Sequence, residues 1–520
     1  MADQNGSAPD GPDLQNEGIV ESDLAVGDML LGNVGDEGVL LVRTEDTVYA
    51  IGATCSHYGG PLADGLFDGS SVRCPWHHAC FDAATGRAVR APARDAIATY
   101  DVESRDGRLF VTHEADHRFV PTPPEHAPSS VVIVGGGAAG EACAETLRDE
   151  GYEGPIVILS ADSDPPVDRP NLSKDFLAGA AEPDWLPLRD PEWYREHHIE
   201  LRLETEVTHI DASARRVELA DGESIEYGRL LLAPGSEPIV LDLPGDDASR
   251  LRTLRSWADS RGLASAAENA SRAVVIGASF IGTEAAASLA QRGLEVHVVA
   301  PEALPLTNVL GPEFGAMVRA LHEKHGVTFH LGTTVERLDG DTVVLEDGTR
   351  IEADLVLAGV GVRPRLDLAR DAGLEVDDGV LVDERLRASA EDIWAAGDVA
   401  SWPDPLTGRR IRVEHWVVAQ RQGATAARNM LGHDEAFDLV PFFWTQQYDI
   451  TINYVGHATD WNEAHVMGDI AAHDGMVAFS EARGTMAVAS VFRDRASLEA
   501  EVALEHRDQR EVAEWLERQS

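Results

Sequence analysis

Two short segments near the N-terminus carry the residue types best suited to binding a metal. They read Cys55-Ser-His57-Tyr-Gly-Gly-Pro and Cys74-Pro-Trp-His77, with sixteen residues between His57 and Cys74. In a [2Fe–2S] cluster of the Rieske type, two thiolates hold one iron and two imidazoles hold the other. A zinc site uses the same ligand set, but zinc-finger spacing groups the cysteines together and the histidines together. Because the two types alternate here, the spacing favours the iron–sulfur cluster, with all four residues as ligands.

The first segment also limits the kind of cluster. Rieske proteins of the respiratory complexes carry a further cysteine in each loop and join the two in a disulfide. The corresponding position in the first loop is Gly60, so that disulfide cannot form. The sequence therefore predicts the ferredoxin-like type of lower potential, with Cys80 as a buried structural thiol and His78 outside the ligand set. The imidazole ligands still place the potential above that of all-cysteine ferredoxins.

A glycine-rich turn between a predicted strand and a predicted helix indicates a dinucleotide site. It reads Gly135-Gly-Gly137-Ala-Ala-Gly140 and matches G-x-G-x-x-G. The glycines allow a tight turn and bring the pyrophosphate close to the N-terminus of the helix. An acidic residue that binds the ribose is expected about 20 residues further on. Ser160 occupies that position, so Asp162, just beyond it, is the candidate.

A second copy of this pattern follows in the middle of the chain. It reads Gly277-Ala-Ser279-Phe-Ile-Gly282, with a serine in place of the middle glycine. A predicted strand comes next, and Glu302 follows it at the distance expected for the ribose ligand. A carboxylate there accepts a hydrogen bond from the ribose 2′-hydroxyl and repels a 2′-phosphate, which favours NADH over NADPH. The alternative is that Glu302 is a surface acid in an acid-rich protein.

The composition predicts a soluble, cytoplasmic protein. The chain has 90 acidic and 43 basic residues and a net charge of −47, which argues against nucleic acid or a membrane as partner. Its first ten residues are polar and acidic, unlike a signal peptide. No apolar run approaches the roughly 18 residues of a membrane helix. Three of the four cysteines lie close together, which in a cytoplasmic chain indicates metal binding before a disulfide.

Between Val131 and about Ala458 the sequence resembles the two-dinucleotide-binding reductases related to apoptosis-inducing factor and to the ferredoxin reductases of oxygenase systems. With the two Cys–His segments included, it is most similar to apoptosis-inducing-factor-like proteins that bear an N-terminal Rieske domain. The segments that carry the resemblance are Asp168-Arg169-Pro-Asn-Leu-Ser-Lys174, Leu232-Ala-Pro-Gly235, Ile393-Trp-Ala-Ala-Gly397-Asp398, Glu414-His415-Trp416 and Phe443-Trp444.

The resemblance implies how these segments are used. It places Glu284 in an ion pair with Lys174 beside flavin N5, where hydride arrives, and makes both residues catalytic candidates. It further implies that FAD is bound by residues of these segments, namely Arg169, Lys174, Gly235, Gly397, Asp398, His415, Trp416 and Trp444.

The residue types themselves support one of these roles and leave the others open. Lys174 is one of only two lysines among 43 cations, which indicates that a compact ammonium is needed there. The alternative is an exposed salt bridge. Asp398 would otherwise be a solvated loop acid, and Trp416 and Trp444 would otherwise be core residues.

The predicted fold is multidomain. A small all-β Rieske domain precedes α/β two-dinucleotide-binding domains, Rossmann-like and specific for FAD and NAD, and a C-terminal α+β domain. The predicted bounds are 1–17 for a disordered N-terminus, 18–113 for the Rieske domain, 114–130 for a linker, 131–255 and 376–435 for the two parts of the FAD-binding domain, 256–375 for the NAD-binding domain and 436–520 for the C-terminal domain.

These features predict an NADH-dependent flavin oxidoreductase of the ferredoxin reductase type. Electrons would pass from NADH through FAD to the chain's own cluster, and then to an external acceptor protein such as an oxygenase. The alternatives are an NADH oxidase and a redox-sensing interaction protein of the apoptosis-inducing-factor type. No C-x-x-C pair is present, which excludes disulfide reductase chemistry. The protein is expected to be a monomer or a homodimer.

Overall fold

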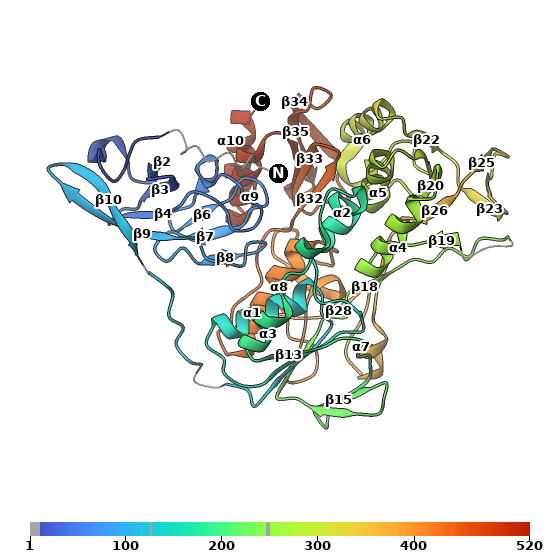
Figure 1. Cartoon of the computed structure of the whole chain (residues 1–520), viewed down its shortest axis with the longest axis horizontal. Helices are drawn as coiled ribbons and strands as arrows, with labels where there is room; N and C mark the ends of the chain where they lie inside the picture. Colours follow the sequence, from blue (N-terminus) through green and yellow to red (C-terminus); the bar gives the residue numbers. More distant parts are fainter. Residues whose placement is uncertain (1–10, 116, 125–126, 246–249, 520) are drawn as a thin grey trace. The chain divides into compact units, whose positions relative to one another are not determined.

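The computed structural model describes residues 11–115, 117–124, 127–245 and 250–519. The chain forms two compact units (Figure 1). Unit 1 contains Met1–Thr122 together with Arg493–Ser520, and unit 2 contains Pro123–Phe492. Unit 1 is built around antiparallel sheets, whereas unit 2 contains two parallel sheets with helices. The predicted succession of an all-β domain and α/β domains is therefore confirmed.

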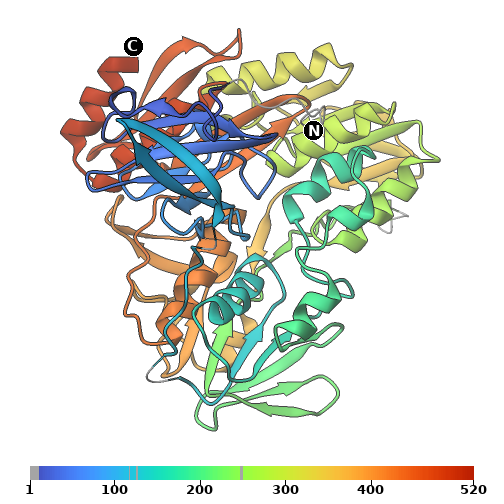
Figure 2. The same cartoon turned by 60° about the vertical axis from the view of Figure 1, so that its left-hand side comes forward.

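The strands of unit 1 form two antiparallel sheets, drawn in shades of blue in Figure 2. The larger sheet has the order β1-β10-β9-β4-β3-β2, with the bounds Ile19–Val20, Arg108–Ala115, Thr99–Arg105, Val48–Gly52, Glu37–Arg43 and Met29–Val34. The smaller sheet has the order β5-β6-β7-β8, with the bounds Leu66–Phe67, Ser71–Arg73, Cys80–Asp82 and Ala88–Arg90. Successive side chains of β3 point to opposite faces of the sheet. Leu40 therefore joins the hydrophobic cluster that contains Cys55 and Cys74, whereas Leu41 joins another.

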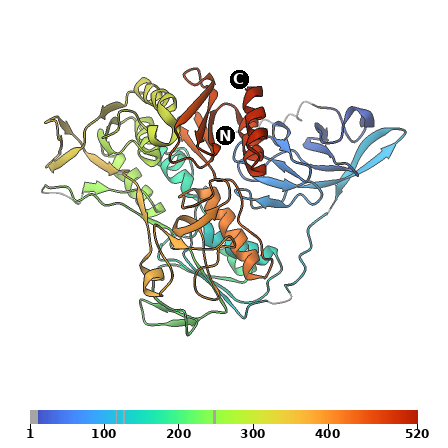
Figure 3. The ribbon, with the colours of Figure 1, turned by 180° about the vertical axis from the view of Figure 1, so that it is seen from behind.

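The last two helices of the chain belong to unit 1. They are α9 (Asp494–His506) and α10 (Gln509–Gln519), drawn in red in Figures 1 and 3. The structure thus differs from the single C-terminal domain predicted for 436–520, since the strands of that segment belong to unit 2. The physical reason is that α10 buries Val512 and Trp515, and α9 forms ion pairs with the smaller sheet of unit 1.

The disordered N-terminus predicted for 1–17 is only partly within the described residues. Leu14 is fully buried, and its backbone N–H donates a hydrogen bond to the carbonyl of Asn33. Its side chain packs against Gly32 of β2, where a β-carbon would lie 2.5 Å from Leu14 Cγ. The prediction of disorder is therefore wrong from residue 11 onward, and residues 1–10 lie outside the described residues.

The linker predicted for 114–130 begins slightly later in the structure. Glu114 and Ala115 still pair with β9 as the end of β10. Residues 117–124 and 127–130 form neither helix nor strand.

The first parallel sheet of unit 2 carries the first glycine-rich turn. Its order is β13-β12-β11-β17-β29, with the bounds Ile199–Arg202, Ile156–Leu159, Val131–Val134, Arg229–Leu232 and Ile393–Ala395. Helix α1 (Ala138–Asp149) follows β11, and α8 (Trp416–Met430) lies beside α1 (Figure 3). The two helices approach closely at Gly423, where a β-carbon would lie 2.1 Å from the carbonyl oxygen of Ala139.

The second parallel sheet repeats this arrangement. Its order is β19-β26-β20-β21-β22, with the bounds Leu251–Arg252, Leu355–Ala358, Arg272–Ile276, Glu295–Ala300 and Thr328–Leu331. The helices of this region are α4 (Trp257–Ala267), α5 (Phe280–Gln291) and α6 (Thr307–Lys324). Helix α5 follows β20 as α1 follows β11, so the two nucleotide motifs occupy equivalent places in the two sheets.

Smaller elements complete the two nucleotide-binding regions. The small sheets are β14-β15-β16 (Val207–Asp211, Arg216–Leu219, Ser224–Glu226), β23-β24-β25 (Val335–Asp339, Thr342–Leu345, Arg350–Glu352), β18-β27 (Ser236–Pro238, Val362–Pro364) and β28-β30-β31 (Val380–Leu381, Ala400–Asp404, Arg409–Ile411). The short helices are α2 (Asp175–Ala178), α3 (Pro191–Glu196) and α7 (Asp367–Asp371).

A five-stranded antiparallel sheet ends unit 2. Its order is β32-β33-β36-β35-β34, with the bounds Phe442–Gln447, Ile450–Gly456, Gly484–Val491, Asp474–Glu481 and Glu463–Asp469. Across the part of the chain that the structure describes, no helix combines the length and the apolar character that crossing a bilayer requires.

Candidate functional site

The four predicted cluster ligands meet in unit 1 at the ends of two loops. Cys55 and His57 follow β4, and Cys74 and His77 follow β6. Both cysteines are buried, and their thiols lie side by side. The Nδ1 atoms of His57 and His77 are 3.3 Å apart. The structure therefore presents a thiol pair beside an imidazole pair.

The backbone of the first loop leaves room beside these ligands. A β-carbon at Gly60 would lie 2.7 Å from Cys74 Sγ, so only glycine fits there. The backbone N–H of Cys55 donates to the carbonyl of Gly60, and the ring of Tyr58 stacks on His57 with 3.9 Å between centroids.

The ligand geometry fits a binuclear cluster. In the described ranges, no group of three or more His, Cys, Asp or Glu side chains is arranged to hold a metal ion. The division into two thiols and two imidazoles is the one that a Rieske cluster requires, and these four residues would hold it. Cys80 is buried as predicted, and no disulfide links any of the four cysteines, all of which lie in described ranges.

The predicted FAD ligands line one large cavity of unit 2. Its volume of about 1550 Å³ exceeds the 300–1,000 Å³ typical of a small-molecule site, so it has room for a ligand as large as a dinucleotide. The predicted site residues that line it are Gly135, Gly137, Asp162, Arg169, Lys174, Gly235, Glu284, Gly397, Asp398, His415, Trp416 and Trp444.

Both glycine-rich turns have the same construction. Gly135 adopts φ +111° and Gly277 adopts φ +103°, conformations that other residues rarely reach. The last glycine of each turn packs on the first: a β-carbon at Gly140 would lie 1.9 Å from the Gly135 carbonyl oxygen, and one at Gly282 would lie 2.2 Å from that of Gly277. Gly140, Gly277 and Gly282 thus shape the turns, although they do not line the large cavity. In the second turn Ser279 is accommodated because its hydroxyl donates to a nearby backbone carbonyl.

The structure joins Lys174 and Glu284 in a nearly buried ion pair. Lys174 Nζ lies 2.9 Å from Glu284 Oε2, and the exposed fractions of the two side chains are 12% and 3%. The carboxylate accepts two more hydrogen bonds, from the hydroxyls of Ser173 and Thr445, each at 2.6 Å. Burial of a charge is costly unless it is paired and hydrogen-bonded, and Glu284 has both kinds of partner. This arrangement excludes the exposed salt bridge considered above.

A buried chain of hydrogen bonds continues from Glu284 toward α6. Gln447 donates from its amide to the hydroxyls of Thr445 and Thr283. Its carbonyl oxygen accepts a hydrogen bond from His322 Nε2 at 2.9 Å. Because Thr445 in turn donates to Glu284, the chain fixes the orientation of the carboxylate from behind.

We expect the stability of unit 2 to fall in acid because of His322. Burial lowers the pKa of this fully buried imidazole to about 4. Between pH 6.5 and 4 the unfolded chain binds a proton that the folded chain does not. The free energy of unfolding should therefore fall by about 1.4 kcal/mol per pH unit, or about 3 kcal/mol in all. His322→Gln should lose less stability than the wild type between pH 7.5 and 5, as measured by urea unfolding. His433→Gln, at an exposed position, should behave as the wild type, and an unchanged pH dependence in His322→Gln would contradict the prediction.

Two arginines form ion pairs with acidic residues at the wall of the large cavity. Asp398 Oδ2 lies 2.6 Å from Arg255 Nη2, and Asp162 Oδ2 lies 3.0 Å from Arg169 Nη2. Asp398 is only 8% exposed, so it is not the solvated loop acid considered above. No sequence pattern singles out Arg255, because arginine supplies almost all cations of this chain.

The aromatic candidates line the cavity and also contact other side chains. Trp416 packs partly against the hydrophobic core, and the ring of His415 lies against Phe443 with 4.5 Å between centroids. Burial, together with the nearby His457, lowers the pKa of His415 to about 3, so its imidazole is neutral near pH 7. Trp416 thus lies both at the cavity wall and against the core, and the predicted role of these aromatic residues toward FAD stays a prediction.

Glu302 lies apart from these residues. It follows β21 at the carboxyl end of the second parallel sheet, the edge at which nucleotides bind in such folds. It is not among the residues that line the large cavity. Sequence reasoning missed Ser173 and Thr445. Thr445 is signalled only as a hydroxyl in the apolar run Phe442-Phe-Trp-Thr445.

Comparison with known proteins agrees with the division of the chain into units 1 and 2. The family model described as Rieske [2Fe-2S] domain matches residues 18–101, and the one described as pyridine nucleotide-disulphide oxidoreductase matches 129–423. Apoptosis-inducing factor 3 of Homo sapiens is 32% identical over 492 residues, which cover 91% of this chain and 81% of the relative. The ferredoxin--NAD(+) reductase component of the anthranilate 1,2-dioxygenase system of Burkholderia cepacia is 38% identical over 344 residues, covering 65% of this chain and 85% of the relative.

A solved structure shows the same fold. The crystal structure of the covalent putidaredoxin reductase–putidaredoxin complex contains a chain with 33% identity and a TM-score of 0.71. The match covers 74% of this chain and 94% of that chain.

These matches confirm the predicted resemblance and the predicted enzyme class, an NAD(P)H-dependent flavin oxidoreductase. The family binds FAD and NAD(H), for which the large cavity of unit 2 has the required glycine turns and room. The first matched segment contains all four predicted cluster ligands, and the second contains both glycine-rich turns. The chain therefore belongs to the pyridine nucleotide-disulphide oxidoreductase family and carries an N-terminal Rieske [2Fe-2S] domain.

Proposed function

We propose that this enzyme transfers electrons from NADH through FAD to its own Rieske cluster, and from there to an external acceptor protein. The observation that carries the proposal is the presence, in one chain, of two Cys–His pairs and a reductase unit with two dinucleotide turns. Among the family's relatives, the reductase is named as a component of a dioxygenase system, or is linked to putidaredoxin in a crystal. In this chain the first electron acceptor after the flavin, the Rieske cluster, would lie on the same polypeptide as the reductase.

The number of electrons that each cofactor can carry explains why both FAD and the cluster would be needed. When bound, FAD would supply the conversion of a two-electron hydride into single electrons, which suits a cluster that takes one electron at a time. The residues of unit 2 would bind and orient the two cofactors. Gly135, Gly137 and the N-terminus of α1 would hold the FAD pyrophosphate, Asp398 the ribityl chain, and Cys55 with its three partners the cluster.

The pair of Lys174 and Glu284 would hold charge beside the flavin. The ammonium of Lys174 also donates a hydrogen bond to the carbonyl of Pro170 at 3.0 Å, so two contacts fix the position of this side chain. Three donors converge on the Glu284 carboxylate, which keeps the pair ordered when nicotinamide binds and water is excluded. We propose catalytic roles for both residues on these contacts.

The acceptor is proposed to be a separate oxygenase or its ferredoxin. The support is the naming of the relatives, whose partners belong to dioxygenase and putidaredoxin systems. An NADH oxidase would instead pass electrons rapidly to oxygen, and a redox-sensing protein would change its partners on binding NADH with little turnover. Assays with ferricyanide, oxygen and a protein acceptor separate these three cases.

We expect Glu302 to decide between the two nicotinamide cofactors. Replacing it with glutamine removes a charged hydrogen bond to the ribose and the repulsion of a 2′-phosphate. The ratio of kcat/KM for NADH over NADPH should therefore fall by about tenfold or more. The control is Glu295→Gln, which removes the same charge from an exposed side chain of β21. Equal ratios in the two variants would show that Glu302 is only a surface acid.

Anaerobic titration with NADH tests the proposed route directly. Flavin absorbance and low-temperature EPR would be followed on the same samples. Flavin bleaching followed by a Rieske signal with average g below 2 is the expected result. Flavin bleaching with a fully oxidised, iron-loaded cluster would overturn the intramolecular route.

A further inference from the structure

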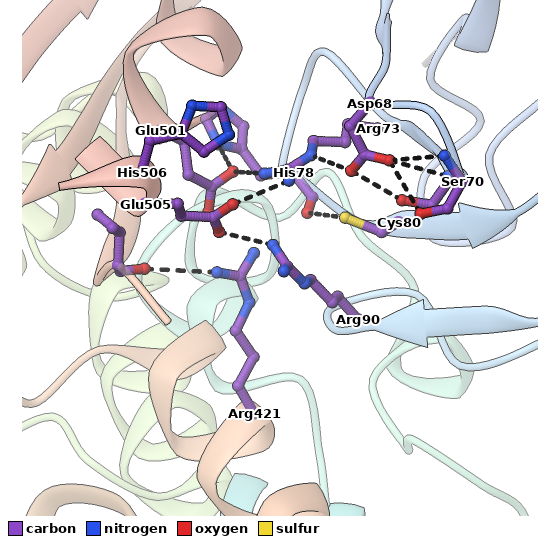
Figure 4. A network of polar contacts seen from close by, with 12 residues as sticks. Asp68, Ser70, Arg73, His78, Cys80, Arg90, Arg421, Glu501, Glu505 and His506 are labelled. Atoms are coloured by element: carbon purple, nitrogen blue, oxygen red, sulfur yellow. Dashed lines mark hydrogen bonds and ion pairs between the residues drawn. The ribbon is translucent and has the colours of Figure 1, made fainter. Parts of the chain in front are cut away.

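Helix α9 places two carboxylates beside the second Cys–His loop of unit 1 (Figure 4). Glu501 Oε2 lies 2.9 Å from His78 Nδ1 and 3.5 Å from Arg73 Nη1. Glu505 Oε2 lies 2.8 Å from Arg73 Nη2. These contacts join residues more than 400 positions apart in the sequence.

The two partners of α9 flank the cluster ligands on both sides. Arg73 comes directly before Cys74, and His78 comes directly after His77. The loop between them is closed by backbone hydrogen bonds from Cys74 to Ala79 and from His78 to Cys74. Helix α9 therefore contacts both ends of the short segment that would hold the cluster.

The contact between α9 and the loop is buried, and burying charged groups costs free energy unless they are paired. The side chains of Arg73, His78 and Glu501 are 4%, 0% and 0% exposed. Buried charges persist only when they are paired, and removing one partner of such a pair is strongly unfavourable. Arg73 also contacts Asp68 at 2.9 Å, so each of its nitrogens has an acidic partner. Contacts of Arg73 and His78 with α9 thus help to hold the loop in one position.

A second arginine extends the network of ion pairs beyond the second cluster loop. Arg90 of β8 lies 2.6 Å from Glu505 Oε1. This pair does not include a residue adjacent to a ligand, so it offers a way to change the charge without disturbing the loop sequence.

We propose that Glu501 and Glu505 of α9 are positioning residues for the Rieske cluster, which hold the second cluster loop in place and lower the reduction potential of the cluster. The inference rests on the proposed assignment of the four ligands. It adds to that assignment a role for a C-terminal helix that contributes no ligand.

The electrostatic part of the inference has a definite sign. Reduction adds one negative charge to the cluster, so a nearby carboxylate disfavours it and a nearby guanidinium favours it. Glu505→Gln should raise the midpoint potential, and Arg90→Gln should lower it. A tenfold change in this one-electron equilibrium corresponds to about 59 mV. Loosening of the fold by itself would shift both variants in the same direction.

The experiment measures the midpoint potential of the full-length protein by EPR-monitored redox titration, with iron content and cluster loss to a chelator on the same samples. Glu501→Gln and Glu505→Gln should show higher potentials and faster cluster loss. The control is Glu514→Gln, which removes the same charge from an exposed side chain of α10 and should match the wild type.

The outcomes separate this inference from the assignment on which it rests. Opposite shifts in Glu505→Gln and Arg90→Gln, with none in Glu514→Gln, would support it. A wild type with a normal Rieske signal and variants that do not differ from the control would overturn the inference and leave the ligand assignment intact. A wild type that contains no cluster after anaerobic reconstitution would overturn both.

Discussion

We expect Cys74→Ser to abolish electron delivery to a protein acceptor while leaving the reductase unit active. Serine cannot replace the thiolate that would hold one iron, so the cluster should be lost. Transfer to a one-electron protein acceptor should fall by more than about 100-fold, because losing a ligand exceeds the 10–100-fold cost of altering its neighbours. NADH-dependent reduction of ferricyanide by the flavin should stay within about twofold of the wild type, since Cys74 and unit 2 belong to separate compact units. Iron analysis, EPR and the two assays measure these quantities.

The matched control is Cys80→Ser. Cys80 is as deeply buried as Cys74 and lies only six positions further along the chain, but it is not a predicted ligand. Its variant should keep the EPR signal and the transfer activity. Loss of the signal in Cys80→Ser, or its survival in Cys74→Ser, would contradict the ligand assignment.

The second large effect is expected at the buried ion pair of unit 2. Lys174→Met leaves the Glu284 carboxylate buried without its cation, which should cost about 3–5 kcal/mol of unfolding free energy. The rate of flavin reduction by NADH should fall by about 100-fold, because the groups beside the reacting atoms are displaced. Stopped-flow absorbance of the flavin and urea unfolding measure the two effects.

A double-mutant cycle separates charge from packing at this pair. Lys174→Met combined with Glu284→Gln removes both charges, so much of the stability lost in the single variant should return, whereas the rate of flavin reduction should stay low. The control is Lys324→Met, which replaces the only other lysine at an exposed position of α6. A double variant as unstable as Lys174→Met, or one with a normal rate, would refute the proposed role of the pair.

Local patterns were sufficient to predict the parts of the protein that local chemistry determines. The alternation of cysteine and histidine around Cys55 and Cys74 depends on spacing alone, and the structure brings these residues together. The turns at Gly135 and Gly277 also follow from short segments, since a strand, a glycine turn and a helix are contiguous in the chain. In these places each motif is recognisable from a short stretch of the chain.

Contacts between distant segments could not be predicted in this way. Thr445 reaches Glu284 only because β32 packs against α5, and Arg255 reaches Asp398 across a similar separation. Helices α9 and α10 were predicted to belong with the strands that precede them. The partners of α9 in unit 1 include Arg73, His78 and Arg90, and nothing in the local pattern of either segment identifies the other.

The return of α9 to unit 1 also has a consequence for how the protein is made. A ribosome translating this chain releases the second cluster loop well before it releases α9, because residues 123–492 are synthesised in between. At about 5–20 residues per second this interval lasts roughly 20–70 s. During that time the nascent loop lacks the carboxylates that later contact Arg73 and His78. Synthesis of the segment Arg493–Ser520 then supplies these partners.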